Sequence, residues 1–274
     1  MLKTPHWEML IVWYFFLGGI AGGAYFTAAI ADYFGGPRDS RVARIGYLLS
    51  LPLVLACGVL LILDLGVPLR FLNMLMTFKF WDPMSIGSWA LGVFGLFAFV
   101  SSVLSFSTDP ARVALRRKIG LVGTLFGFFL ASYTGVLLSA TALPPWSGGR
   151  LMGALFLASG ASTGMAAVSL ILFLTGAVAG DGWSKVKRAD RFAIIFELVM
   201  LAAFLAVLGA AAQPFLSGAM APLFWGGLVI VGLLVPLVLE FTMHGARAVS
   251  AVTAALVLVG GFILRYVVVM SVHT

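Results

Sequence analysis

The chain has few residues that would let it face water. Charged residues make up only 10% of its 274 positions, whereas apolar residues make up 62%. Soluble domains have roughly 25% charged and about 45–50% apolar residues. So small a charged fraction cannot cover a water-facing surface. The composition therefore excludes a soluble protein and predicts an integral membrane protein in contact with the lipid bilayer.

Cysteine and histidine are also scarce. The one cysteine, Cys57, cannot form an intrachain disulfide or hold an iron–sulfur cluster, which needs about four ligands. The three histidines, His6, His244 and His273, all lie outside the middle of the apolar runs. Because haem iron takes axial ligands such as histidine, a haem inside the bilayer would need histidines at that depth. We therefore expect no haem, no iron–sulfur cluster and no metal site in this protein.

Long apolar runs are abundant instead. A β-barrel would show segments of about 10 residues with alternating polarity, but these runs are continuous, which predicts helices. Most have about 20 residues or more, enough to cross a ~30 Å hydrocarbon core at 1.5 Å per residue. The first run is longer than a signal-peptide core, so we expect it to be retained. The predicted spans of this all-α protein are 9–34, 45–64, 86–106, 119–141, 152–179, 192–213, 222–243 and 249–270.

Basic residues are concentrated in alternate loops. Of the 17 Lys and Arg residues, 12 lie in the first, third, fifth and seventh connections, and 4 lie on the opposite side. Cytoplasmic loops carry an excess of Lys and Arg. We therefore expect a multi-pass protein of a prokaryotic cytoplasmic membrane with both termini on the outer, periplasmic side. The net charge of +7 reflects these loops, and we expect no nucleic-acid partner.

Polar and aromatic side chains gather near the outer ends of the first four spans. Asp64 ends the second span, and Arg70 follows six residues later, which allows an ion pair across a turn. Charges in a membrane are costly and mark functional candidates, although such a pair can also anchor a span end. Tyr14 and Trp89 lie near the same face, where aromatic anchoring is common. Tyr133 lies deeper, and a buried phenol needs a hydrogen-bond partner.

The outer connection 65–85 is rich in Met and Phe and carries Arg70 and Lys79. We expect it to form an interfacial helix on the outer membrane surface, with a plain loop as the alternative.

Three charged residues lie in the second half. Glu197 is expected about a turn and a half inside the cytoplasmic end of its span, and Glu240 lies near the same end of the next span. Arg265 is expected about 16 residues from the inner end of the last span, so a direct pair with Glu197 is not favoured. Such residues can form a proton relay. The favoured interpretation is hydrogen bonding between helices that stabilises the bundle.

Glycines four residues apart recur in the first and fifth predicted spans. This spacing places both members of a pair on one helix face and predicts close helix packing. The pairs are Gly18/Gly22, Gly19/Gly23 and Gly160/Gly164.

Several short segments, in this order, resemble the NrfD/PsrC family of polysulfide reductase-type membrane subunits. Together with Glu197 they cover essentially the whole sequence. They are WYFFLGGIAGGAY in the first span, DLGVPLRFLNML from residue 64, PMSIGSW at 83–89, SYTG at 132–135, LFLASGASTG at 155–164 and GGFILRY at 260–266.

The resemblance implies eight transmembrane helices in two four-helix bundles, here 1–141 and 142–274. It implies a haem-free membrane subunit that exchanges electrons between the quinone pool and an iron–sulfur partner, and that anchors their complex. The implied quinone site lies near the outer face of the first bundle. Tyr133 matches a tyrosine implicated there, and Asp64 stands at an acidic position. Tyr14 stands where the polysulfide reductase member has a histidine.

The resemblance also implies the partners. They are a periplasmic-side four-cluster iron–sulfur protein and a catalytic molybdopterin or multihaem cytochrome subunit. The exchangeable cofactor is menaquinone or ubiquinone, and the protein is expected to be enzymatic only within the complex. We assign Asp64 and Tyr133 as catalytic residues, Asp64 as the proton acceptor. The predicted quinone-binding residues are Tyr14, Asp64, Arg70, Asn73, Trp89 and Tyr133.

A multi-span transporter or proton-conducting protein is the alternative function. Transporters often contain helices that are broken near the midplane of the bilayer. Pro52 and Pro236 interrupt two predicted spans, but neither lies in an unwound Gly/Pro cluster.

Overall fold

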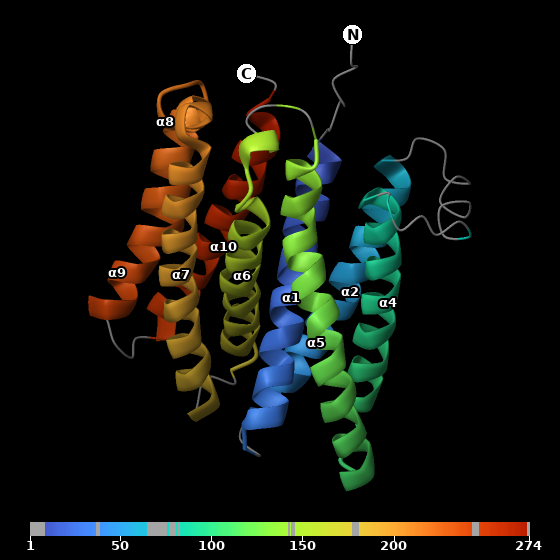
Figure 1. Ribbon diagram of the computed structural model, residues 1–274. Coiled ribbons are helices and arrows are strands. Elements are labelled where there is room, and N and C mark those ends of the chain that lie inside the picture. The colour runs from blue at the N-terminus through green and yellow to red at the C-terminus, as the bar shows by residue number, and fades with distance from the viewer. Residues whose placement is uncertain are drawn as a thin grey trace.

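The computed structural model describes residues 9–36, 39–64, 76, 81, 83–141, 143, 146–176, 181–242 and 247–272. Eight helices in these ranges are long and apolar enough to cross a membrane. This confirms the prediction of an all-α, multi-pass membrane protein. Figure 1 shows that the first residues of α1 and the last residues of α10 lie at the same end of the bundle. Which side of the membrane that end faces stays a prediction.

The helices follow one another along the sequence with short connections. The first four long helices are α1 (Met9–Phe34), α2 (Ser40–Asp64), α4 (Pro83–Leu104) and α5 (Pro110–Ser139). The others are α6 (Met152–Leu174), α7 (Asp181–Leu208), the π-helical η4 (Leu223–Leu234) with its continuation α9 (Val235–Thr242), and α10 (Arg247–Met270). Short helical turns are η2 (Trp146–Gly148), η3 (Gly209–Ala212) and α8 (Gln213–Leu216).

Helices α5 and α7 begin nine and eleven residues earlier than predicted, more than any other helix. Helix α5 begins at Pro110 instead of 119, because Asp109 caps it by accepting a hydrogen bond from the Arg112 amide at 3.3 Å, and proline suits a first helical turn. Helix α7 begins at Asp181 instead of 192. Hydropathy detects only the part of a helix that lies in the hydrocarbon core, whereas these helices continue into basic segments outside it.

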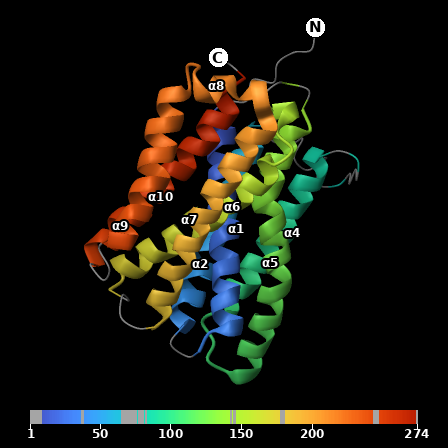
Figure 2. The same cartoon turned by 60° about the vertical axis from the view of Figure 1, so that its left-hand side comes forward.

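Helices α1 and α6 form the centre of the molecule. In their most apolar windows 78% of the residues are buried, against 28% for α2. Both views show α1 in the middle of the bundle, in contact with α2, α5 and α6 (Figures 1 and 2). The division into two bundles at residue 141 stays a prediction, since α1 and α5 both pack against α6.

Glycine allows this close packing. A Cβ added at Gly23 would overlap the backbone of Gly160 and Gly164 on α6, and one added at Gly22 would overlap the Gly127 carbonyl on α5. The structure therefore confirms close helix packing at Gly22, Gly23, Gly160 and Gly164, whereas a Cβ at Gly18 would make only an ordinary contact with Cys57. In a membrane, close van der Waals packing replaces the hydrophobic effect as the force between helices.

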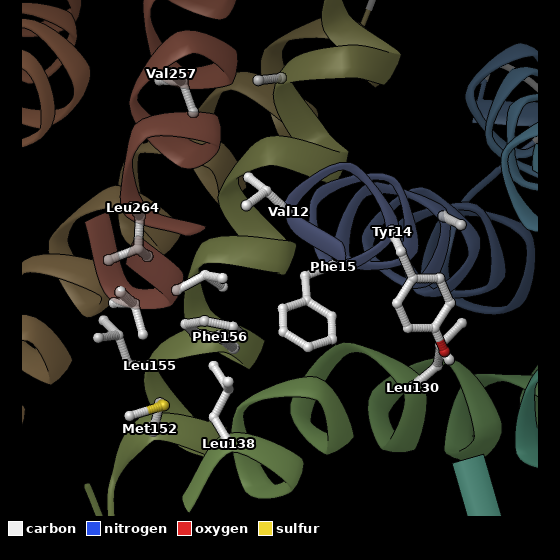
Figure 3. Packing of buried hydrophobic residues seen from close by; sticks show 14 of the residues in the cluster. Val12, Tyr14, Phe15, Leu130, Leu138, Met152, Leu155, Phe156, Val257 and Leu264 are labelled. Atoms are coloured by element: carbon white, nitrogen blue, oxygen red, sulfur yellow. The ribbon is translucent and has the colours of Figure 1, made fainter. Parts of the chain in front are cut away.

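Neighbouring side chains of α1 face different partners (Figure 3). Phe15 lies against Phe156 of α6, with ring centroids 6.2 Å apart. Tyr14 points instead toward α5. This one-residue difference places a phenol among the first four helices and an apolar ring in the central seam.

Candidate functional site

A small pocket lies where α1 and α4 begin and where α2 and α5 end. Its volume is about 70 Å³, room for roughly five water molecules. Three of the predicted site residues, Tyr14, Asp64 and Tyr133, meet in its wall. The remaining lining residues, mostly apolar and not predicted from the sequence, are Ile11, Phe15, Leu61, Met84, Gly87, Ser88 and Leu137. We call this the phenolic pocket.

Tyr133 is held rigidly at one side of the phenolic pocket. Its hydroxyl donates a hydrogen bond to the Pro83 carbonyl at the start of α4. Its ring stacks on Phe129, with centroids 5.5 Å apart and planes 21° apart. Gly87 makes room for the ring, because a Cβ at that position would overlap it. Since a phenol hydroxyl has one hydrogen and Tyr133 donates it to Pro83, any further hydrogen bond to its oxygen is one that Tyr133 accepts.

Tyr14 differs from Tyr133 in its hydrogen bonding. Its side chain is only 4% exposed, yet its hydroxyl makes no hydrogen bond with any described residue. Its backbone carbonyl accepts a weak hydrogen bond from the Cys57 thiol at 3.7 Å. A buried phenol usually has a hydrogen-bond partner. Tyr14 therefore brings an available donor into a pocket that is otherwise mostly apolar.

Asp64 lies at the rim. It is the last residue of α2, and it is exposed. Two predicted ligands, Arg70 and Asn73, fall outside the described residues, as does most of the 65–85 connection. The ion pair between Asp64 and Arg70 and the interfacial helix therefore stay predictions. The pocket combines an acceptor, a donor and a carboxylate that water can reach.

Trp89, predicted to bind quinone, does not line the phenolic pocket. It lies in a separate apolar groove with Phe126 and Phe129, and it is 40% exposed. Helix geometry explains the difference: Trp89 follows Gly87 by two residues, a rotation of about 200°. Gly87 faces the pocket, so Trp89 faces away from it.

A second polar site lies among α6, α7 and α10. Arg265, fully buried, donates hydrogen bonds to the Ser159 hydroxyl and to the Phe156 carbonyl, the latter at 3.2 Å. Ser162, one turn along α6, donates to Glu197 of α7. Two serines one turn apart thus link the carboxylate to the guanidinium, and the two charged groups also interact electrostatically.

The sequence interpretation placed Glu197 and Arg265 at different depths, and this was wrong. Glu197 lies 16 residues from the first residue of α7, and Arg265 lies 18 residues from the first residue of α10. Both helices begin at the same end of the bundle (Figure 1). The error came from starting the sixth span at 192, which removed eleven residues from the count. The described residues nevertheless contain no direct ion pair between the two side chains.

Glu240, the third predicted relay residue, lies in a different cluster. It accepts a hydrogen bond from Lys187, which also donates to Thr253 at 3.2 Å. Arg191 approaches Glu240 at 3.8 Å. Asp190, which sequence reasoning missed because it was assigned to a loop, is fully buried, and Lys187 lies 3.9 Å from it.

The two clusters share a helix face. Asp190 and Glu197 are seven residues apart on α7, two turns or about 10 Å along the axis. Asp190 also interacts electrostatically with both Glu240 and Glu197. Among the described residues, both carboxylate oxygens of Asp190 and one each of Glu197 and Glu240 lack a hydrogen-bond partner. We call the two clusters together the charged network.

The described ranges hold no group of three or more His, Cys, Asp or Glu side chains arranged to bind a metal ion. All three histidines lie outside these ranges, so the expectation of a haem-free protein stays a prediction.

Known proteins are similar to this one over nearly its whole length. A family model described as "Polysulphide reductase, NrfD" matches residues 1–274. A polysulfide reductase subunit of Wolinella succinogenes is 29% identical, and the match covers 99% of the present sequence and 96% of the relative. The protein NrfD homolog of Haemophilus influenzae is 27% identical, and the match covers 98% of the present sequence and 95% of the relative. Protein NrfD of Escherichia coli is 26% identical, and the match covers 97% of the present sequence and 94% of the relative.

Proposed function

The protein belongs to the NrfD (polysulphide reductase) family, and on this basis we propose that it is the quinone-reactive membrane subunit of a respiratory oxidoreductase complex. It would exchange electrons between the quinone pool and an iron–sulfur partner and anchor the complex in the membrane. The observation that carries the proposal is the buried Tyr14 hydroxyl, which faces the phenolic pocket without a hydrogen-bond partner among the described residues.

The chemistry of the lining fits a quinone head group. The wall is mostly apolar, as a lipid-soluble ring requires, and its few polar groups are a donor, an acceptor and a carboxylate. Tyr14 suits a quinone carbonyl, because the Tyr14 hydroxyl can donate a hydrogen bond to the carbonyl oxygen. Tyr133 suits a quinol hydroxyl, because the Tyr133 hydroxyl already donates its hydrogen to the Pro83 carbonyl and could only accept a hydrogen bond from a ligand. Of the predicted ligands, Arg70 and Asn73 remain part of the proposal, and Trp89 does not.

The bound quinone or quinol supplies two-electron, two-proton chemistry. In the direction of quinol oxidation, Asp64 accepts the two protons in turn at the rim and releases the first to water before it takes the second. Tyr133 orients the hydroxyl that loses the proton, and Arg70 would favour the ionised form of Asp64 by its opposite charge. The electrons leave to the partner subunit, which would dock at the end of the bundle that holds the pocket.

The proposed partners follow from the resemblance. One is a four-cluster iron–sulfur protein on the periplasmic side, and the other is a catalytic molybdopterin or multihaem cytochrome subunit. The proposed quinone is menaquinone or ubiquinone. The name of the Wolinella relative describes that protein as part of a polysulfide reductase, and it assigns no terminal substrate to the present protein.

The charged network supports a second role within the same proposal. Carboxylate oxygens of Glu240, Asp190 and Glu197 lack a hydrogen-bond partner among the described residues, and ordered water molecules would bridge them. We propose that Glu240, Asp190, Glu197 and Arg265 form a proton relay reaching halfway through the membrane. Pure helix-to-helix bonding is the competing role, and the two differ in their response to Glu197→Gln, which is considered in the Discussion.

The test of the quinone site is quinol-dependent reduction of the partner's clusters in membranes. Tyr14→Phe and Tyr133→Phe each remove one hydroxyl, and losing a hydrogen bond costs about 0.5–1.5 kcal/mol. This corresponds to a loss of roughly threefold to tenfold. Tyr14→Phe is expected to weaken binding of the quinone more than of the quinol, and Tyr133→Phe the reverse. Asp64→Asn removes the titratable group and is expected to cost more activity than either.

Tyr33→Phe is the matched control, because Tyr33 lies on α1 but is half exposed at the other end of the helix. It is expected to leave the rate unchanged. All variants should assemble with the partner subunits, since none changes side-chain volume much. Wild-type rates in Tyr14→Phe, Tyr133→Phe and Asp64→Asn together would show that the phenolic pocket is not the quinone site.

A further inference from the structure

Four arginines line one cavity at the end of the bundle opposite the phenolic pocket. Arg41 and Arg44 come from the first turns of α2, and Arg116 and Arg117 come from α5. The cavity volume is about 520 Å³, and serine and threonine hydroxyls from the α4–α5 connection complete its wall. We call it the arginine pocket.

Among the residues that line the arginine pocket, one is a carboxylate. Asp32 of α1 is buried and accepts two hydrogen bonds from Arg116, at 2.7 and 2.8 Å. Arg117 lies 3.6 Å from the same carboxylate. Within the described ranges, Arg41 and Arg44 make no ion pair with any carboxylate. The pocket therefore carries a net positive charge of about three.

Two other carboxylates, Asp39 and Asp109, adjoin pocket residues in the sequence, and neither lines the pocket. Asp109 caps α5 by accepting from the Arg112 amide. Asp39 pairs with Lys185 of α7 at 2.7 Å. Burial alone would raise the pKa of Asp39, but hydrogen bonds from Lys185 and from the Gly36 amide outweigh it and lower the pKa. Asp39 is thus charged and paired with Lys185, and it does not neutralise the arginine pocket.

An exposed apolar stripe of α4 leads to this pocket. Leu96, Phe99 and Val103 recur at helical spacing and are 62%, 54% and 54% exposed. Phe106, in the turn that follows the helix, continues the stripe and also forms part of the pocket wall. The Arg44 guanidinium lies over its ring, 4.7 Å from the centroid. An amphiphile with an anionic head and an apolar tail would match both surfaces at once.

We propose that the arginine pocket binds the phosphate headgroup of an anionic phospholipid whose acyl chains lie along α4. Guanidinium groups bind phosphate oxygens in pairs of parallel hydrogen bonds, and hydroxyls add further donors. Basic pockets between transmembrane helices are suited to such headgroups. A free phosphate would use the same arginines but would leave the apolar stripe without a role, so the two sources are separable by experiment.

The experiment is a native mass-spectrometry titration of the purified, delipidated full-length protein. The probes are phosphatidylglycerol, phosphatidylcholine and inorganic phosphate. Phosphatidylglycerol is expected to bind more tightly than the other two. Arg41→Gln with Arg44→Gln is expected to weaken its binding about 30-fold, since each basic residue near an anionic headgroup contributes about fivefold. Both arginines are exposed, so the double variant should fold normally.

The matched control is Arg112→Gln with Lys118→Gln, which removes the same charge from exposed positions of α5 outside the pocket. It is expected to change phosphatidylglycerol binding by less than about threefold. Equal losses in the two double variants would mean diffuse surface attraction and would overturn the proposal. Binding of inorganic phosphate as tight as that of the lipid would also overturn it, in favour of a free anion.

Discussion

The phenolic pocket and the charged network handle polar groups in opposite ways. In the pocket, two neutral phenols are buried in an apolar wall, and the one charged group, Asp64, stays at the exposed rim. In the network, Arg265, Glu197 and Asp190 are all buried, each within reach of an oppositely charged group or a hydroxyl.

The two regions are therefore suited to different roles. A pocket that combines the unused donor of Tyr14 with the hydroxyl oxygen of Tyr133, held by Pro83, is suited to an exchangeable ligand. A buried network of charges is part of the fold, because removing one member leaves another charge without compensation. Variants in the network should therefore reduce stability first, and variants in the pocket should reduce activity first.

The largest effect is expected for Arg265→Met. It keeps much of the apolar stem but removes the hydrogen bonds of the guanidinium to Ser159, Gly261 and Phe156 and leaves Glu197 without its neighbouring positive charge, which together should cost about 3–5 kcal/mol. The measurement is the unfolding free energy of the purified protein in detergent. Arg150→Met, at an exposed position, is the control and should change it by less than about 0.5 kcal/mol. If Arg265→Met and Arg150→Met changed the unfolding free energy equally, the charged network would not be a special source of stability.

An intermediate effect is expected for Gly87→Ala. The added Cβ would overlap the Tyr133 ring, and overpacking of this kind costs about 1–3 kcal/mol. Because the ring must move, quinol-dependent activity should fall at least as far as in Tyr133→Phe. Gly92→Ala, on the same helix, is the control, since nothing lies within 4 Å of its added Cβ. It should be neutral or stabilising by up to about 1 kcal/mol. Full activity in Gly87→Ala would separate Tyr133 from the reaction.

The smallest effect on stability is expected for Glu197→Gln. The amide oxygen can still accept the hydrogen bond from Ser162, and Arg265 keeps its hydrogen bonds to Ser159 and to the Gly261 and Phe156 carbonyls. Arg265 loses only its negative neighbour, so the unfolding free energy should fall by less than in Arg265→Met. A relay needs a titratable group, however, and the amide has none. Proton movement per quinol oxidised, followed with a pH-sensitive dye inside proteoliposomes of the complex, should fall while the quinol rate persists. Unchanged proton movement would assign the network a purely structural role.

Much of the architecture was predictable from the sequence, but helix ends were not. Apolar runs located all eight spans, because only the hydrocarbon core demands continuous apolar residues. They missed the first turns of α5 and α7, which lie in basic segments. The shortened α7 led to the wrong depth for Glu197 and hid Asp190. The Asp109–Pro110 pair was the one local signal that would have corrected α5.

The candidate site was only partly predictable. Residue type and depth selected Tyr14, Asp64 and Tyr133, which the fold brings together. They also selected Trp89, because depth says nothing about which way a side chain points around its helix. The hydrogen bond from Tyr133 to Pro83 joins residues 50 positions apart and had no signal in the sequence.

The sequence by itself determined that the protein lies in a lipid bilayer, how many spans it has and that basic residues are concentrated at one end. These properties depend only on composition along the polypeptide. It also determined that glycine faces would pack closely, since four-residue spacing is a property of any helix. Only the tertiary structure decided which of the two phenols keeps a free donor, and which carboxylates share a face of α7 with Arg265 opposite. Those outcomes depend on how helices rotate and shift against one another, and helix packing, which is not local in sequence, sets both.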